Sequence, residues 1–238
     1  MEIKILFDNY TQDRSKFEMG WGFSCLINED VLFDTGEDGD LLVKNVKAMG
    51  VDANKIQKIV ISHDHYDHTG GLYGFLRQYP GKEVYILSSF REEIKIIIKK
   101  GGGKYIINDE FKELHPNIFT TGLIKGVYMG GTMPEQSLIV KMEKGLIVIT
   151  GCSHPGIVTI LERVKEFFPQ EKIFAVLGGF HLLDKGKREI DYIIEKFKSL
   201  GVEKVGPTHC TGWEAIKAFQ EAYGDNFLSL GAGATLTF

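Results

Sequence analysis

The sequence predicts a single α/β domain across residues 1–238, with β-layers inside and helices outside. Two observations lead to this prediction. Short apolar segments of strand length alternate with longer segments whose apolar residues recur at helical spacing. No internal repeat, low-complexity stretch or linker interrupts this alternation, so the pattern marks no domain boundary.

Nine apolar segments are predicted to be strands. The first several lie close together in the sequence and are joined by tight polar turns such as Asn28-Glu29-Asp30, which favours antiparallel hairpins. In chain order the predicted strands are 3–8, 22–28, 31–34, 58–62, 83–87, 137–142, 146–150, 172–177 and 204–206.

Amphipathic spacing predicts helices between these strands. The apolar residues of segments 41–49, 157–168 and 190–200 each fall on one helical face, and we interpret them as core. Asp40 is the expected N-cap of the first of these helices, and Gly201 is expected to end the last. Segment 92–100 is a fourth predicted helix. The triple glycine that follows it comes after no strand and opens no helix, which argues against a phosphate-binding loop.

The composition argues against nucleic acid and membrane partners. Hydrophobic residues make up 43% of the chain, enough for a sizeable core, and the net charge of −4 offers no basic surface to nucleic acid. Charged residues or glycine break every apolar run before it reaches membrane-spanning length, and residues 1–8 resemble a strand more than a signal peptide. Cys25, Cys152 and Cys210 form no disulfide framework, so we expect reduced thiols in a cytoplasmic protein.

The most informative segment is 59–72, where three histidines and two aspartates directly follow a buried-type strand. His63 and His65 are two residues apart, so in extended backbone their side chains point the same way and can chelate one metal ion. Asp67 and His68 come where the chain turns and can face a second ion. Imidazole and carboxylate donors predict two divalent ions, zinc before manganese or iron.

The residues at 62–71, S-H-D-H-Y-D-H-T-G-G, resemble the signature of the metallo-β-lactamase superfamily. The Phe33-Asp34-Thr35-Gly36 turn resembles the same family. The resemblance covers nearly the whole chain and implies a four-layer αββα sandwich with the metal site at one edge of the sheets. It also implies that Asp34 supports the metal-binding loop.

Three further histidines each come just after an apolar strand, the position at which layered α/β proteins gather their sites. Because they share this placement, we expect them to contribute to one site. His115, in contrast, is expected in a polar loop without a role. The three residues are His154, His181 and His209.

The sequence departs from the family pattern at two places. The hairpin that opens with the third histidine of the first metal is here 133–140, with Glu135 or Gln136 in the histidine's place. Segment 150–152, T-G-C, stands where the family has T-G-D with a bridging aspartate. We therefore prefer His154 as the third ligand, with Glu135 as the rival. Cys152 either bridges the ions as a thiolate or is a small residue at a tight strand end.

The resemblance assigns roles to the remaining candidates. His209 matches the final histidine of the family and faces the second metal. His181 then has no metal role left, so it becomes a candidate proton donor or phosphate contact. Asp67 and His181 are accordingly the expected catalytic residues, and the six expected ligands are His63, His65, Asp67, His68, His154 and His209.

Several short motifs spread along the chain resemble the subgroup that contains the archaeal dihydropterin ribofuranosyl-aminobenzene phosphate synthases of methanopterin biosynthesis. This likeness implies the condensation of a dihydropterin methyl diphosphate with ribofuranosyl-aminobenzene phosphate, releasing pyrophosphate. The substrates expected are therefore small phosphorylated molecules. The motifs lie at 8–10, 21–24, 134–140, 150–156, 178–182 and 208–212.

Two alternatives remain open at this stage. One is hydrolysis of a phosphoester or another ester by a metal-activated water. The other is a metal-binding or redox protein without hydrolytic activity. It is less favoured, because the sequence contains no flavin-binding domain and no cofactor motif.

Overall fold

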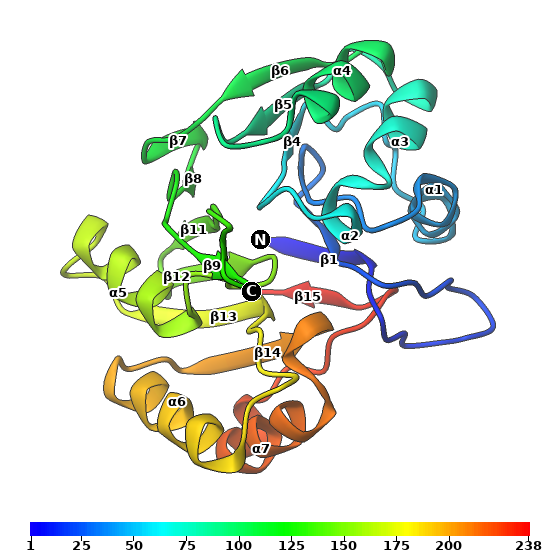
Figure 1. Ribbon diagram of the computed structural model, residues 1–238. Coiled ribbons are helices and arrows are strands. Elements are labelled where there is room, and N and C mark those ends of the chain that lie inside the picture. Colours follow the sequence, from blue (N-terminus) through cyan, green and yellow to red (C-terminus); the bar gives the residue numbers. More distant parts are fainter. The chain divides into compact units, whose positions relative to one another are not determined.

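The computed structural model describes residues 1–238, which divide into two compact units. Unit 1 comprises Met1–Asp109 and Leu230–Phe238, and unit 2 comprises Glu110–Ser229. Each unit contains one large mixed sheet with helices, so the predicted α/β class is confirmed (Figure 1). The single domain expected from the sequence stays a prediction.

Unit 1 is built on a seven-stranded sheet in the order β15-β1-β2-β3-β4-β5-β6. The neighbours from β15 to β3 are antiparallel, which confirms the predicted hairpins, and those from β3 to β6 are parallel. The strands are β1 (Glu2–Phe7), β2 (Ser24–Ile27), β3 (Val31–Phe33), β4 (Lys58–Val60), β5 (Glu83–Ile86), β6 (Lys104–Ile107) and β15 (Thr235–Thr237).

Four helices belong to unit 1: α1 (Gly39–Ala48), α2 (Tyr66–Thr69), α3 (Leu72–Gln78) and α4 (Glu92–Lys100). The prediction that Asp40 caps α1 is wrong. Asp38 is the N-cap, and its Oδ1 accepts hydrogen bonds from the backbone N–H groups of Asp40 and Leu41 at 2.8 and 3.0 Å. Asp40 lies one residue inside the helix, where its carboxylate still faces the positive end of the helix dipole.

Unit 2 is built on a six-stranded sheet in the order β14-β13-β12-β11-β8-β7, with a separate two-stranded hairpin, β9-β10. The strands β12, β13 and β14 run parallel to one another. The strands are β7 (Lys112–His115), β8 (Ile118–Thr120), β9 (Val127–Tyr128), β10 (Gly131–Thr132), β11 (Leu138–Met142), β12 (Gly145–Thr150), β13 (Ile173–Gly179) and β14 (Lys204–Thr208).

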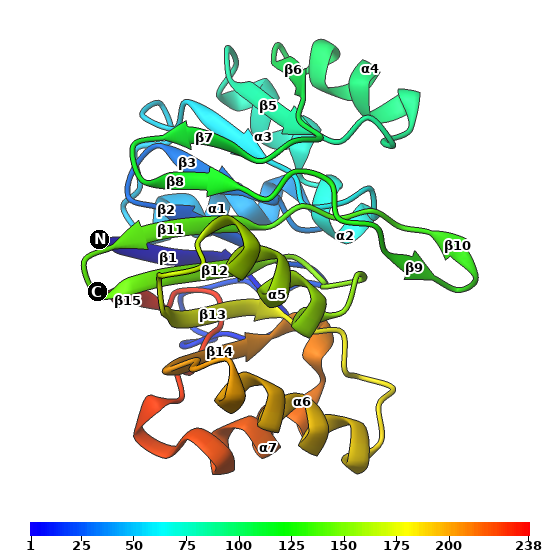
Figure 2. The same cartoon turned by 90° about the vertical axis from the view of Figure 1, so that its left-hand side faces the viewer.

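The three helices of unit 2 pack on this parallel part of its sheet (Figure 2). They are α5 (Ile157–Phe167), α6 (Lys187–Ser199) and α7 (Trp213–Tyr223), with short 3₁₀ turns at His209–Thr211 and Gly224–Asn226. The rings of Phe180, Phe197 and Phe219 meet at centroid distances of 5.2–5.4 Å in the centre of the core. Such aromatic packing buries large apolar areas and stabilises the end of β13 that carries His181.

The sequence prediction misplaced or missed several elements. His115, expected in a polar loop, is the last residue of strand β7. Helix α7 and the short strands β6 to β10 and β15 were not predicted, because most of them are partly exposed and too short to show a clear apolar pattern. None of the helices has both the length and the apolar character required to cross a lipid bilayer.

Candidate metal centre

His63 and His65 extend from the segment that follows strand β4 in unit 1. The Nε2 atom of His63 lies 3.1 Å from the Nδ1 atom of His65. Two imidazole nitrogens that each lie about 2.0–2.1 Å from one tetrahedral zinc ion are separated by about 3.3 Å. The spacing in the structure therefore fits two ligands of one cation, and it confirms that the two side chains point the same way.

Asp34, which follows strand β3, holds the histidine segment in place through hydrogen bonds to Ser62 and His68. It is fully buried, and its Oδ1 accepts a hydrogen bond from the Ser62 backbone N–H at 2.7 Å. Its Oδ2 accepts from the Ser62 hydroxyl and from Nδ1 of His68, both at 2.7 Å. The support of the metal-binding loop that the family resemblance implied for Asp34 is thus present in the structure.

This network assigns the protons of His63 and His68. The Ser62 hydroxyl donates its only proton to Asp34, so it accepts a hydrogen bond from Nδ1 of His63 at 2.9 Å. The Nδ1 atoms of both histidines therefore carry protons, so in the neutral rings each Nε2 presents a lone pair. Histidines that bind metals are oriented in this way, with one ring nitrogen held by a carboxylate or hydroxyl.

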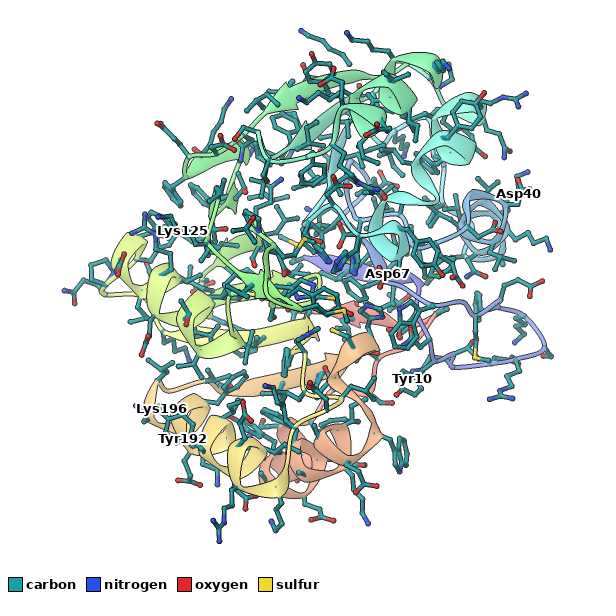
Figure 3. The ribbon with its side chains drawn as sticks, viewed as in Figure 1. Tyr10, Asp40, Asp67, Lys125, Tyr192 and Lys196 are labelled. Carbon is teal, nitrogen blue, oxygen red and sulfur yellow. The ribbon has the colours of Figure 1, made fainter.

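Asp67 and His68 form a second donor pair on helix α2. Oδ2 of Asp67 lies 3.6 Å from Nε2 of His68, and both side chains are buried. Figure 3 labels Asp67, whose side chain extends from α2. One carboxylate oxygen and one imidazole nitrogen at this distance suit a divalent ion of the zinc type.

Gly71 explains why the motif ends in glycine. A Cβ atom at this position would lie 2.1 Å from the carbonyl oxygen of Thr35, so no other residue fits without moving the backbone. Thr35 also donates from Oγ1 to the carbonyl oxygen of His68 at 2.8 Å. The turn after β3 and the histidine segment therefore pack backbone to backbone, which holds Asp34 against its partners.

Asp64, between the two histidines, has a different role. Its carboxylate accepts hydrogen bonds from Arg91, at 2.6 Å from the backbone N–H and at 3.1 and 2.9 Å from the guanidinium. Arg91 is the N-cap residue of α4, so this pair connects the histidine segment to a helix that follows later in the chain. The sequence did not reveal Arg91, because nothing local links residues 27 positions apart.

In unit 2, the candidates come from the carboxyl ends of three parallel strands. His154 follows β12, His181 follows β13 and His209 follows β14, and parallel neighbours end at the same edge of a sheet. The donor atoms of Cys152, His154 and His181 lie within 4.8 Å of one another. Those of Cys152 and His209 also lie within 4.8 Å, so Cys152 is close to all three histidines.

Two histidines of this cluster, and the serine that precedes His154, have left-handed backbone conformations. The φ angles are +70° at Ser153, +54° at His181 and +53° at His209. A residue other than glycine in this region costs on the order of 1–3 kcal/mol and persists only where the surrounding structure holds it. Such strain is typical of sites where a side chain has to point in one particular direction.

Glu135 shapes the loop that carries His154. Its side chain is buried, and Oε1 accepts from the N–H groups of Cys152 and Ser153 while Oε2 accepts from that of His154, each at 2.9 Å. Successive N–H groups that converge in this way form a natural binding place for an anionic oxygen. Gln136, the other residue considered at this position, accepts a hydrogen bond from the Thr120 hydroxyl at 2.8 Å.

We expect Glu135→Gln to lower the free energy of unfolding by about 2–4 kcal/mol, because an amide group places an NH₂ against buried N–H donors. Metal content should stay at the wild-type level. Chemical denaturation and elemental analysis of the purified variant measure both quantities. Glu143→Gln, at an exposed position in the turn between β11 and β12, is the matched control. Unchanged stability together with lost metal would instead make Glu135 a ligand.

His181 and Cys210 interact with each other. A hydrogen bond to Cys210 is the main cause that raises the pKa of His181, and the charges of Cys210, Glu135 and Asp184 act in the same direction, while burial opposes them. Burial acts to raise the pKa of the Cys210 thiol. The hydrogen bond with Cys152, the charge of His209, and the hydrogen bond and charge of His181 outweigh this effect, so the pKa is lowered.

Cys25 contrasts with Cys210. It is fully buried in unit 1, and burial together with the nearby charge of Asp34 raises the pKa of its thiol well above the ordinary value. A thiol in this setting stays protonated and is a poor metal ligand. All three cysteines are free, in agreement with the prediction of reduced thiols.

Comparison with known proteins connects both units to one family. The sequence profile of the metallo-beta-lactamase superfamily matches residues 26–209. The chain is 32% identical to 7,8-dihydropterin-6-methyl-4-(beta-D-ribofuranosyl)-aminobenzene-5'-phosphate synthase of Methanocaldococcus jannaschii, over 100% of this chain and 97% of that protein. It is 34% identical to a second, uncharacterized protein of the same archaeon, over 90% and 92% of the two chains.

A solved structure agrees with this relationship. The crystal structure of Tm1679, described as a metal-dependent hydrolase of the beta-lactamase superfamily, matches with a TM-score of 0.84 and 34% identity. The match covers 100% of this chain and 99% of that one. It confirms the predicted fold class over the full length of the chain.

Proposed function

Because this chain belongs to the metallo-β-lactamase superfamily and is a metal-dependent enzyme, we propose that it is a synthase acting on a dihydropterin and a ribofuranosyl-aminobenzene phosphate. The reaction joins the dihydropterin, as its methyl diphosphate, to the aminobenzene compound and releases pyrophosphate. The observation that carries this proposal is the full-length similarity to the synthase of Methanocaldococcus jannaschii. The partners are thus small phosphorylated molecules.

We propose that the protein binds two divalent ions, zinc before manganese or iron. The donor chemistry fits them, since His63 and His68 present lone pairs on Nε2 and Asp67 adds a carboxylate. Held by these residues, two such cations would supply positive charge to neutralise the diphosphate oxygens of the leaving group. The proposed ligands are His63, His65, Asp67, His68, His154 and His209.

Glu135 and Cys152 are the remaining candidates for metal binding. The Glu135 carboxylate accepts hydrogen bonds from three backbone N–H groups, so its oxygens already have partners within the protein. This favours His154 over Glu135 as the third ligand of the first ion. Cys152 stays an alternative ligand, because its sulfur lies within 4.8 Å of the donor atoms of His154, His181 and His209. Its thiolate would select a soft or borderline cation such as zinc.

The protein's own groups carry the remaining steps. His181 binds or protonates an oxygen of the departing diphosphate, as its strained backbone and its hydrogen bond to Cys210 hold the imidazole in one orientation. Asp34 and Ser62 keep His63 and His68 in the protonation state that a ligand requires. The protein also has to hold the second substrate next to the reacting carbon, because the correct mutual orientation of two reactants lowers the barrier to their reaction.

The proposal is tested with zinc-loaded protein and both substrates. We expect pyrophosphate release that depends on the presence of the second substrate, together with a condensed product detected by mass spectrometry. Pyrophosphate or phosphate release from the diphosphate substrate alone would indicate hydrolysis instead. No reaction with the pair, while a generic phosphodiester is cleaved, would also reject the synthase assignment.

A second candidate function is hydrolysis of a phosphoester or another ester. It is favoured by the solved structure described as a metal-dependent hydrolase, which matches this chain over its full length. The same donor residues would serve both reactions, so the substrate assay above separates them. The third alternative, a metal-binding protein without hydrolytic activity, is not proposed further, because the relatives with a stated activity are enzymes.

A further inference from the structure

The β9–β10 hairpin of unit 2 is firmly attached at its base. Ile124 and Glu135 exchange two backbone hydrogen bonds of 2.9 and 3.0 Å, and the N–H of Met133 donates to the carbonyl of Gly126 at 2.9 Å. A Cβ atom on Gly126 would lie 2.3 Å from the carbonyl oxygen of Met133 and 3.0 Å from the carbonyl carbon of His154. The base of the hairpin therefore packs directly on the loop that carries His154.

The tip of the hairpin is a tight two-residue turn. Tyr128 pairs with Gly131, and the two residues between them, Met129 and Gly130, both have positive φ angles of +48° and +79°. This conformation is that of a type I′ turn, which sets the register of a hairpin and so fixes which side chain lies on which face. Figure 2 shows the hairpin standing clear of the six-stranded sheet.

Tyr128 lies on the side of the hairpin that faces the histidines of unit 2. Its ring centroid is 5.0 Å from that of His154 and 5.7 Å from that of His181, with interplanar angles of 64° and 74°. These are edge-to-face contacts. The residue paired with Tyr128 across the hairpin is Gly131, which has no side chain to cover the ring, and Tyr128 remains 38% exposed.

We propose that Tyr128 is a specificity-determining residue that packs against a planar aromatic group of the substrate. Because the Tyr128 and His181 ring centroids are 5.7 Å apart, a ligand that contacts His181 would lie beside the Tyr128 ring. The neighbouring Met129 is 89% exposed at the turn, and flexible methionine side chains commonly contact flat apolar groups. This inference rests on the proposed function only in naming the aromatic group, the pterin or the aminobenzene ring.

The expected effect follows from the size of aromatic contacts. An aromatic pair contributes enough to binding that its removal weakens affinity by about 3- to 10-fold. Tyr128→Ala should therefore weaken binding of an aryl phosphate by that factor and leave binding of inorganic phosphate unchanged. Tyr128→Phe keeps the ring and should bind the aryl phosphate like the wild type.

The experiment measures dissociation constants of zinc-loaded protein by titration calorimetry for phenylphosphonate, an aryl phosphate analogue without a hydrolysable ester bond, and for inorganic phosphate. Elemental analysis confirms that every variant holds the same amount of zinc. Tyr192→Ala is the matched control, since Tyr192 is an exposed tyrosine on α6 whose ring contacts Lys196, as labelled in Figure 3.

Three outcomes contradict the inference. They are equal losses for both ligands in Tyr128→Ala, no loss for the aryl phosphate, and a wild-type protein that binds the aryl compound no better than phosphate. The readout is binding and not turnover, so it is independent of the synthase assay. A protein that fails that assay can still show the effect of Tyr128, and the reverse also holds.

Discussion

His63→Ala is expected to lose bound metal and to lower turnover by at least about 10³-fold. A metal ion contributes several kcal/mol of charge stabilisation in the transition state, and each 1.36 kcal/mol corresponds to a factor of ten in rate. His63 is fully buried and its Nε2 atom, 3.1 Å from Nδ1 of His65, is the lone-pair nitrogen of its ring. Its removal therefore takes away one of two donors that converge on the same point.

Elemental analysis of the purified variant and steady-state kinetics on the substrate that passes the assay measure the two effects. His115→Ala is the matched control, because His115 ends strand β7 and belongs to neither donor cluster. The control should keep both metal and activity. Unchanged metal content in His63→Ala would exclude this residue as a ligand.

His181→Ala is expected to keep its metal ions and to lose about two to four powers of ten in turnover, the usual contribution of a positioned proton donor. Its φ angle of +54° and its ring contact with His154 at 4.4 Å place the imidazole beside the cluster. Alanine removes the group that protonates or binds the departing oxygen, while the six proposed metal ligands stay in place.

Metal content and kinetics again separate the possible roles of His181. Retained activity with full metal would remove His181 from the mechanism. Loss of metal from the variant would make His181 a ligand, and the assignment of His154 would then have to be revised. Such a role is chemically feasible, because the donor atoms of Cys152 and His154 lie close to that of His181. A conservative variant, His181→Gln, separates proton donation from phosphate binding. If His181 donates a proton, the variant should be about as inactive as His181→Ala, because a glutamine amide cannot replace an imidazolium as a proton donor. If His181 only binds phosphate, the variant should recover part of the activity.

The sequence alone was sufficient wherever the determining interactions are local. The alternation of apolar segments predicted the hairpins of β1 to β3 and the strands that lead to His154 and His209, since burial periodicity acts within a few residues. The spacing of His63 and His65 likewise predicted their common direction, because side chains two apart in extended backbone lie on one side.

Interactions between distant residues could be found only in the tertiary structure. The N–H groups bound by Glu135 lie 17 to 19 positions away from it, and Arg91 reaches Asp64 across 27 positions. No local pattern distinguishes a carboxylate that binds a metal from one that binds backbone, so the sequence left Glu135 open as a ligand.

The sequence by itself thus determined the fold class, the histidine segment and the strand ends at which further donors emerge. The tertiary structure decided how each donor is used: which nitrogen of His63 is protonated, which carboxylate shapes a loop, and which aromatic ring, that of Tyr128, lies beside His181. The physical reason is that burial patterns appear as local periodicity in the sequence. Hydrogen-bond partners and ring contacts, in contrast, depend on where the folded backbone brings distant residues together.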